Sequence, residues 1–290
     1  MSFPCMNANC VTQLRRRSAS FTTRRPRPGM AGHVHLIGSG PGDPELLTLR
    51  ALRLLQEADV VVYDRLVSDE IMALIPATTR RIDVGKMPKR HKLPQDGINQ
   101  LLVDLALQGL NVARLKGGDP LIFGRGSEEA EVLRAAGIGC SYVPGITAAQ
   151  GMASSTGVPL THRGLATGVR YVTGHRARDR SLDLDWASLA SEQTTLVVYM
   201  GAANIAEISD RLIAAGLPGD LPAMAVAAAT TPREARIVST LAALPAEIAE
   251  AAPEAPVLFV IGHVVSLYRG AEDGLAAAAH AGAMQVAANA

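Results

Sequence analysis

Residues 111–126, with the sequence NVARLKGGDPLIFGRG, constrain the fold more than any other part of this chain. The apolar residues Val112 and Leu115 indicate a short strand, which the glycines and proline of 117–120 bring to an end. A helix is expected at 127–136, with acidic residues in its first turns, where carboxylates suit the helix dipole. A strand, a glycine-rich loop and a helix in this order are typical of α/β folds, which bind ligands beyond the carboxyl ends of their strands.

The same alternation continues on both sides of this stretch. It predicts a mainly parallel sheet in the first half, with strands at 33–38, 60–63, 81–84, 112–116 and 140–143 and helices at 47–58, 69–74, 98–108 and 127–136. Asp43 and Asp96 are expected to cap helices, and Gly109 to end one. The second half alternates again, with strands at 168–173, 194–199, 223–227, 236–239 and 257–261 and helices at 186–190 and 205–215.

The length of 290 residues allows two domains of ordinary size. A change to small residues at Ile146 divides the body, so we expect one α/β domain at 33–145 and a second at 146–270. We expect residues 1–32 to form a disordered arginine-rich tail and residues 271–290 a frayed alanine-rich end. Residues 1–32 also have the composition of an organelle transit peptide. Another alternative is that translation starts at Met30, downstream of most of this tail.

Charge is distributed unevenly along the chain. Residues 1–32 contain six arginines and no acidic residue, which leaves 22 basic against 27 acidic residues in the body. An acidic body argues against nucleic acid as a partner. A protein that binds nucleic acid through the tail would lose its function when residues 1–29 are deleted, whereas we expect activity to be retained.

The sequence contains no pattern typical of a metal site, a membrane span or a dinucleotide-binding loop. The three cysteines, Cys5, Cys10 and Cys140, have no metal-binding spacing and suit a reducing compartment, so we expect no metal and a cytoplasmic location. The apolar runs are too short to span a membrane. The loop at 38–43 fails the dinucleotide fingerprint, because Asp43 stands in place of its last glycine and would repel a pyrophosphate.

Two charged residues follow predicted strands, at the edge where α/β sheets carry functional groups. Asp64 follows a strand of three valines and a tyrosine, although it could equally cap a loop or pair with Arg65. Lys86 follows Gly85 at the end of another strand, although a solvated surface lysine would look the same. Basic residues between positions 65 and 92 favour a polyanionic substrate, with a solvated face as the alternative.

A series of motifs in order resembles the tetrapyrrole methylase family. The motifs are LIGSGPGDPELLTLRA, VVYDRLVS, VGK, ARLKGGDPLIFGRG, VPGITAA, GVPLTHR, VTGH and VVYMG, and they cover the chain from His33 to about Gly270. Within the family, the motifs are most similar to those of members that methylate uroporphyrinogen III.

The resemblance implies two α/β domains of the class III type, with S-adenosylmethionine bound in the cleft between them, and a homodimer. It implies that Asp64 is the proton acceptor and Lys86 the proton donor. The residues that it assigns to the cofactor are Pro41, Gly117, Gly118, Asp119, Ile122, Thr147, Ala148, Met200 and Ala229.

The sequence departs from the family at one cofactor position. Where the family often has Glu-Asn-Gly-Thr, this chain has three alanines and Thr230, so Ala229 replaces a glycine. A backbone contact would survive if φ is negative at this position, whereas a positive φ would strain the alanine.

The implied reaction transfers two methyl groups from S-adenosylmethionine to C2 and C7 of uroporphyrinogen III and gives precorrin-2, a precursor of siroheme and cobalamin. Cations are expected to bind the substrate carboxylates, and our candidates are Arg65, Arg80, Arg81, Lys89, Arg90, His91, Arg114 and Arg163. Two alternatives remain: a methylase of the same fold that acts on a later precorrin, and a relative that binds S-adenosylmethionine without transferring its methyl group.

Overall fold

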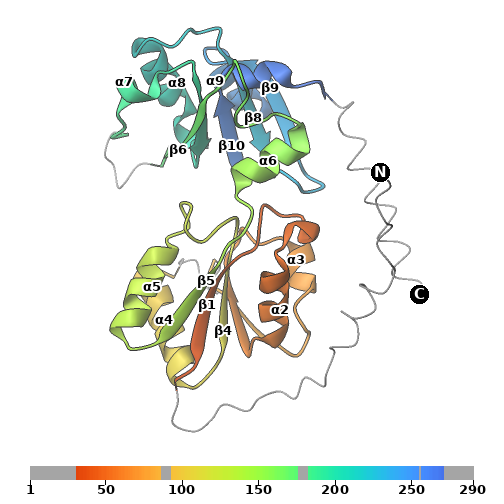
Figure 1. The fold of residues 1–290 in the computed structure, drawn as a ribbon, viewed down its shortest axis with the longest axis vertical. Helices are drawn as coiled ribbons and strands as arrows, with labels where there is room; N and C mark the ends of the chain where they lie inside the picture. Colours follow the sequence, from red (N-terminus) through yellow and green to blue (C-terminus); the bar gives the residue numbers. More distant parts are fainter. Residues whose placement is uncertain (1–30, 86–92, 176–181, 255, 271–290) are drawn as a thin grey trace, which may run out of the picture.

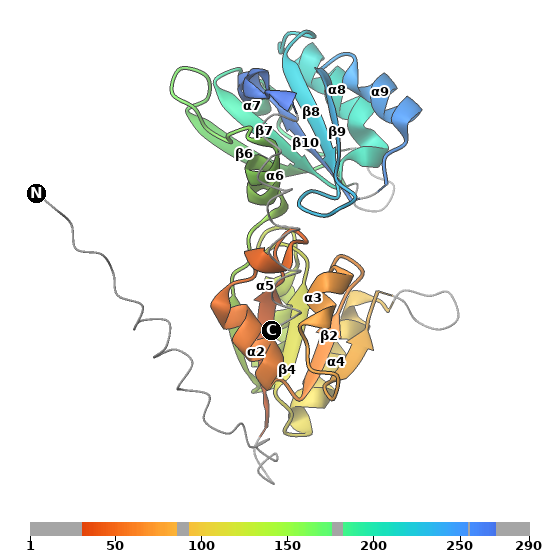
Figure 2. The ribbon, with the colours of Figure 1, turned by 90° about the vertical axis from the view of Figure 1, so that its right-hand side faces the viewer.

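The computed structural model describes residues 31–85, 93–175, 182–254 and 256–270. The predicted tails therefore lie almost wholly outside the described residues. Two α/β domains lie one above the other along the longest axis of the molecule, and α6 (Ala148–Thr156) lies at their junction (Figures 1 and 2). The chain passes from the first sheet to α6 between residues 144 and 147.

The first domain contains a parallel five-stranded sheet in the order β3-β2-β4-β1-β5. Its valine-rich central strands are buried on both faces, as parallel strands covered by helices require. The strands are β1 (His33–Gly38), β2 (Val60–Tyr63), β3 (Arg80–Asp83), β4 (Val112–Lys116) and β5 (Gly139–Val143).

Helices cover both faces of this sheet. On one face, α2 (Leu49–Glu57) and α3 (Asp69–Ala73) pack against side chains such as Ile37 and Leu115. On the other, α4 (Gln95–Leu107) and α5 (Gly126–Ala135) pack against Leu36 and Val62. The helix after β1 and the helix after β4 thus lie on opposite faces, although these two strands are neighbours. Such a switch point opens a crevice at the carboxyl ends of the two strands.

The second domain has a mixed sheet in the order β6-β7-β10-β8-β9, in which β6 pairs with β7 in parallel and the other neighbours pair antiparallel. The strands are β6 (Gly168–Thr173), β7 (Thr194–Tyr199), β8 (Pro222–Ala227), β9 (Ala235–Thr240) and β10 (Val257–Ile261). One face packs against α6 and the 3-10 helix η3 (His263–Leu267). The other packs against α7 (Trp186–Leu189), α8 (Ile205–Ala214) and α9 (Leu244–Ala251).

The expected α/β class is confirmed, and most element bounds agree with those predicted to within one or two residues. Asp43 caps the short 3-10 helix η1 (Pro44–Leu46), while Thr48 caps α2. Gly109 follows α4 with a φ of 81°, as a helix-ending glycine should. A second 3-10 helix, η2 (Ala202–Asn204), precedes α8.

Two expectations about the helices need correction. Asp96 is not an N-cap, because α4 begins earlier and its N-cap position is Pro94, so Asp96 lies inside the first turn. The helix α9 was not expected from the sequence. Its eight residues include Pro245 and form too short a run to be recognised by periodicity, and packing of Leu244 and Ile248 into the core stabilises so short a helix.

Three loops cross closely at the carboxyl edge of the first sheet. A Cβ atom at Gly145 would lie 2.2 Å from the Gly118 carbonyl oxygen and 2.9 Å from the Gly38 Cα. A Cβ atom at Gly38 would in turn lie 2.5 Å from the same carbonyl oxygen. All of these neighbours are backbone atoms, so only glycine permits the crossing.

We therefore predict that Gly145→Ala lowers the free energy of unfolding by about 3 kcal/mol, because backbone atoms on both sides would have to move. Urea denaturation followed by circular dichroism measures this change. Gly168→Ala in β6 is the matched control, since a Cβ atom there would meet the Thr194 Cγ2 at an ordinary 3.7 Å. Equal stability of the two variants would contradict the assigned packing.

Candidate active site

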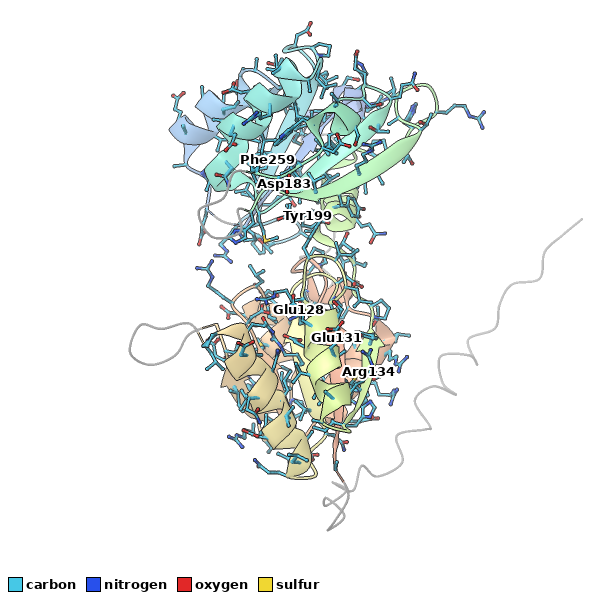
Figure 3. All side chains as sticks on the ribbon, turned by 90° about the vertical axis from the view of Figure 1, so that its left-hand side faces the viewer. Glu128, Glu131, Arg134, Asp183, Tyr199 and Phe259 are labelled. Atoms are coloured by element: carbon cyan, nitrogen blue, oxygen red, sulfur yellow. The ribbon has the colours of Figure 1, made fainter. Side chains whose placement is uncertain are left out.

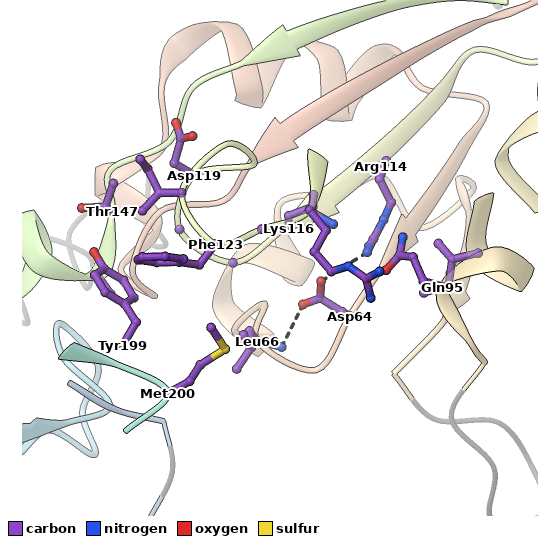
Figure 4. Close-up of a pocket in the computed structure, with 17 residues that line it drawn as sticks. Asp64, Leu66, Gln95, Arg114, Lys116, Asp119, Phe123, Thr147, Tyr199 and Met200 are labelled. Carbon is purple, nitrogen blue, oxygen red and sulfur yellow. Dashed lines mark hydrogen bonds and ion pairs between the residues drawn. The ribbon is translucent and has the colours of Figure 1, made fainter. Parts of the chain in front are cut away.

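A cavity of ≈ 310 Å³ opens at the carboxyl ends of β2 and β4, and residues of the second domain line its other side (Figure 4). This volume suits a small organic ligand. The cavity is lined by Asp64, Leu66, Gln95, Ile98, Arg114, Lys116, Gly117, Gly118, Asp119, Ile122, Phe123, Gly124, Arg125, Thr147, Ala148, Tyr199 and Met200.

Nine of the fifteen predicted site residues that the structure describes meet in this cavity, although they come from four separate segments of the chain. They comprise the predicted proton acceptor, one predicted substrate residue and seven predicted cofactor residues: Asp64, Arg114, Gly117, Gly118, Asp119, Ile122, Thr147, Ala148 and Met200. Figure 4 shows Phe123 and Tyr199 near Thr147 on one side and Asp64, Arg114 and Gln95 together on the other.

The loop after β4 is shaped by its glycines and by Asp119. Gly118 has a φ of 66°, and its amide donates to the Gly40 carbonyl at 2.8 Å. The Asp119 carboxylate accepts two backbone amides, from Leu121 at 2.8 Å and from Gly145 at 3.1 Å. Asp119 therefore joins the loop to the start of the interdomain segment, and the two glycines line the cavity.

The second domain contributes the start of α6 to the opposite wall. Thr147 caps this helix in a reciprocal capping box with Gln150. The amide of Ala149 donates to the Tyr199 hydroxyl at 3.2 Å. Burial raises the pKa of the Tyr199 phenol, so Tyr199 stays protonated and neutral at physiological pH.

An aromatic and a methionine side chain complete this wall. The rings of Phe123 and Tyr199 are 5.0 Å apart, so the two domains touch here through aromatic contact. Met200 has a φ of 54° and a half-exposed side chain, and Phe123 has a φ of 51°. Non-glycine residues with positive φ are uncommon and often lie at functional sites.

The charged side of the cavity is centred on Asp64. One carboxylate oxygen accepts the Leu66 amide at 3.1 Å, and the other lies 3.4 Å from Arg114 Nη2. The Asp64 side chain is 27% exposed, so it remains accessible from the cavity while its orientation is held. Its ion-pair partner is thus Arg114, and not Arg65 as one interpretation of the sequence suggested.

Two predicted cofactor residues lie beside the cavity rather than in its lining. Pro41 packs against α6, where a Cβ atom at Gly151 would come within 2.6 Å of it. Ala229 belongs to a loop that contacts the first domain. The Asp43 amide donates a hydrogen bond to Thr230 Oγ1 in this loop at 3.3 Å. Ala228 and Thr230 have positive φ values of 46° and 67°, but Ala229 does not, so alanine replaces glycine here without backbone strain.

The predicted substrate residues lie in different environments. Arg65, Arg80, Arg81 and Arg163 are exposed and lie outside the cavity lining, and Arg81 donates to the Ile75 carbonyl at 2.8 Å. Arg114 is in the lining but only 2% exposed. Four predicted residues lie outside the described residues: Lys86, Lys89, Arg90 and His91.

Sequence reasoning missed several lining residues, of which Lys116 carries the clearest signal. Arg114 and Lys116 alternate within a buried strand and therefore point to the same face of the sheet. Buried cations need an anionic partner. The following helix supplies one in Glu129, which is fully buried. Phe123, Arg125 and Tyr199 lie within the quoted motifs but were not singled out, and Gln95 has no local signal.

Nothing in the described ranges suggests a metal ion or a membrane span. No group of three or more His, Cys, Asp or Glu side chains there is placed to bind a metal. No described helix is both long and apolar enough to cross a bilayer.

Comparison with known proteins gives consistent matches. The family described as Tetrapyrrole (Corrin/Porphyrin) Methylases matches residues 33–245. A uroporphyrinogen-III C-methyltransferase from Paracoccus denitrificans is 64% identical over 257 residues, which cover 89% of this chain and 88% of the relative. A crystal structure of uroporphyrin-III C-methyl transferase from Thermus thermophilus, complexed with S-adenyl homocysteine, superposes with a TM-score of 0.69 at 41% identity. That match covers 82% of this chain and all of the other.

Longer relatives also match. A siroheme synthase from Chromobacterium violaceum is 52% identical over 237 residues, which cover 82% of this chain but only 50% of the relative. This chain thus spans about half the length of the siroheme synthase.

The geometry of Asp119 generates a stability prediction. Asp119→Asn should lower the free energy of unfolding by about 2 kcal/mol, because one carbonyl oxygen cannot replace two carboxylate oxygens that each accept a backbone amide. Thermal or urea unfolding measures the loss. Asp104→Asn, at an exposed aspartate on α4 that accepts from Gln100, is the control and should change stability by less than about 0.5 kcal/mol. If both variants changed the free energy of unfolding by a similarly small amount, the two hydrogen bonds of Asp119 would not stabilise the loop as described.

Proposed function

The chain belongs to the tetrapyrrole methylase family, and from this premise we propose that it is a uroporphyrinogen-III C-methyltransferase. It transfers methyl groups from S-adenosylmethionine to C2 and C7 of uroporphyrinogen III and forms precorrin-2. The observation that carries this proposal is the cavity, which joins an open glycine loop and an accessible carboxylate from one domain to the start of α6 and Met200 from the other.

The residues in the cavity fit S-adenosylmethionine. A side chain at Gly117 would collide with Leu66, with a Cβ contact of 2.7 Å, so glycine keeps backbone groups available to a ligand. Gly117–Asp119, Thr147 and Ala148 would hold the polar parts of the cofactor, while Ile122 and Met200 supply apolar contact. When bound, the cofactor supplies a methyl group on a positively charged sulfur, so no nucleophilic side chain is required.

The protein contributes orientation and charge. Two domains that close around one cavity hold the substrate carbon in line with the donor and exclude water, which favours the reaction mainly through proximity. Attack by a pyrrole carbon develops positive charge on the macrocycle, and the fixed Asp64 carboxylate stabilises it. Asp64 also accepts the proton whose loss restores conjugation.

Lys86 is our proposed proton donor. The last described residue before it, Gly85, lies against the residue that follows Asp64, since a Cβ atom at Gly85 would come within 2.8 Å of the Arg65 amide nitrogen. The cations proposed for the substrate carboxylates remain Arg65, Arg80, Arg81, Lys89, Arg90, His91 and Arg163, while the burial of Arg114 favours a role in orienting Asp64.

Further parts of the proposal rest on the family resemblance and on composition. We propose that the protein is a homodimer in the cytoplasm, with no nucleic-acid or membrane partner, and that Pro41 and Ala229 contact the cofactor through the backbone beside the cavity.

The direct test is incubation with uroporphyrinogen III and S-adenosylmethionine, read by mass and absorbance. The expected product carries two added methyl groups. Methylation of a later precorrin with no reaction of uroporphyrinogen III would contradict the proposal, and so would cofactor binding without transfer in a single turnover.

Within this function, Asp64→Asn should slow single-turnover methyl transfer by about 10²-fold, because the carboxylate that stabilises charge and accepts the proton is lost. The affinity for S-adenosylhomocysteine, measured by calorimetry, should stay within about twofold. Asp69→Asn, at an exposed position on α3, controls for the substitution itself. An unchanged rate in Asp64→Asn would remove Asp64 from the mechanism.

A further inference from the structure

A buried cluster of charges lies directly behind Asp64. Glu129 on α5 is fully buried, and its Oε1 accepts from Lys116 Nζ at 2.8 Å and from Arg114 Nε at 3.2 Å. Gln95 on α4 donates to the same oxygen at 3.2 Å. The Asp64 carboxylate then meets Arg114 from the opposite side, so Arg114 bridges two carboxylates.

Arg114 is fixed at both ends of its guanidinium group. Its Nε faces Glu129, its Nη2 faces Asp64, and its Nη1 donates to the Val62 and Leu115 carbonyls at 3.4 and 3.1 Å. A planar guanidinium held in this way has one orientation, in contrast to a lysine ammonium on a flexible stem. The direction from which Arg114 meets Asp64 is therefore set by Glu129.

Glu129 also balances the charge of the cluster. Arg114 and Lys116 are both almost fully buried, and two buried cations without a second carboxylate would repel each other at high cost. Burial and the nearby Arg114 lower the pKa of Lys116, whereas Glu129 and the more distant Asp64 raise it.

We propose that Glu129 is a positioning residue for the reaction: by holding Arg114, it fixes the orientation in which Asp64 faces the cavity. This inference rests on the proposed role of Asp64 in methyl transfer and adds a residue that has no place in the cavity lining. Glu129 touches neither substrate nor cofactor in this account, and its effect on the reaction passes through Arg114.

The experiment is a double-mutant cycle on the full chain, with single-turnover methyl transfer to uroporphyrinogen III as the readout. Glu129→Gln keeps the shape of the side chain and one acceptor oxygen but removes the charge. We expect the rate to fall about 10- to 100-fold, since small misplacements of a reacting group have effects of this size. The affinity for S-adenosylhomocysteine should stay within about twofold, because the glycine loop is not altered.

The same substitution in the Asp64→Asn background should slow transfer by less than about twofold, because the group that Glu129 positions is already lost. Independent, multiplicative losses in the double variant would overturn the inference, as would an unchanged rate in Glu129→Gln. Glu131→Gln, an exposed glutamate on α5 (Figure 3), is the matched control and should leave the rate unchanged.

If Glu129→Gln does not fold, Arg114→Lys replaces it in the cycle, since lysine cannot bridge both carboxylates. The same lack of additivity with Asp64→Asn is then expected.

If the wild-type chain transfers no methyl group, the proposed function fails on its own. The coupling between Glu129 and Asp64 is then measured from the urea unfolding midpoints of the wild type, the two single variants and the double variant, without substrate. Additive midpoint shifts would then overturn the link between Glu129 and Asp64.

Discussion

The structure depends on the close crossing of three backbone segments at the carboxyl edge of the first sheet. Gly38 and Gly145 allow the loops after β1 and β5 to approach the Gly118 carbonyl, in the loop after β4, within distances that no side chain would tolerate. The carboxylate of Asp119 then ties two of these loops together. Gly118 and Asp119 also line the cavity, and the chain continues from Gly145 into the second domain, so the proposed ligand site and the domain junction share one arrangement.

Charged side chains from the strand before the glycine loop and from the helix after it form ion pairs with one another. The strand that leads into the glycine loop carries two buried cations, and the helix that leaves the loop returns a buried glutamate to them. Because Arg114 reaches past this glutamate to Asp64, the ordered loop, the core of the domain and the accessible carboxylate form one connected unit. An aspartate on a surface loop without these contacts would adopt several side-chain orientations. The contacts of Asp64 with Arg114 and the Leu66 amide instead hold its carboxylate in one orientation.

The sequence predicted the strands well because their apolar runs are continuous and their ends are marked by glycine, as at Val257–Ile261 and Thr194–Tyr199. It did not predict α9, whose helical state depends on tertiary packing, or the antiparallel pairings of the second sheet, which alternation alone does not define. Most of the proposed cofactor residues were recognisable because they lie in motifs. The place of Gln95 beside Glu129 and the hydrogen bond of Tyr199 with Ala149 could not be predicted, because both contacts join segments distant in the sequence.

The central claim is that the methyl donor binds between the domains, on the glycine loop of the first and the start of α6 of the second. A crystal structure of this chain with S-adenosylhomocysteine tests it most directly. The account predicts density in contact with Gly117, Gly118 and Ala148, with the sulfur directed towards the side of the cavity that holds Asp64. Density at any other place on the molecule, with this cavity filled by water alone, would contradict the account.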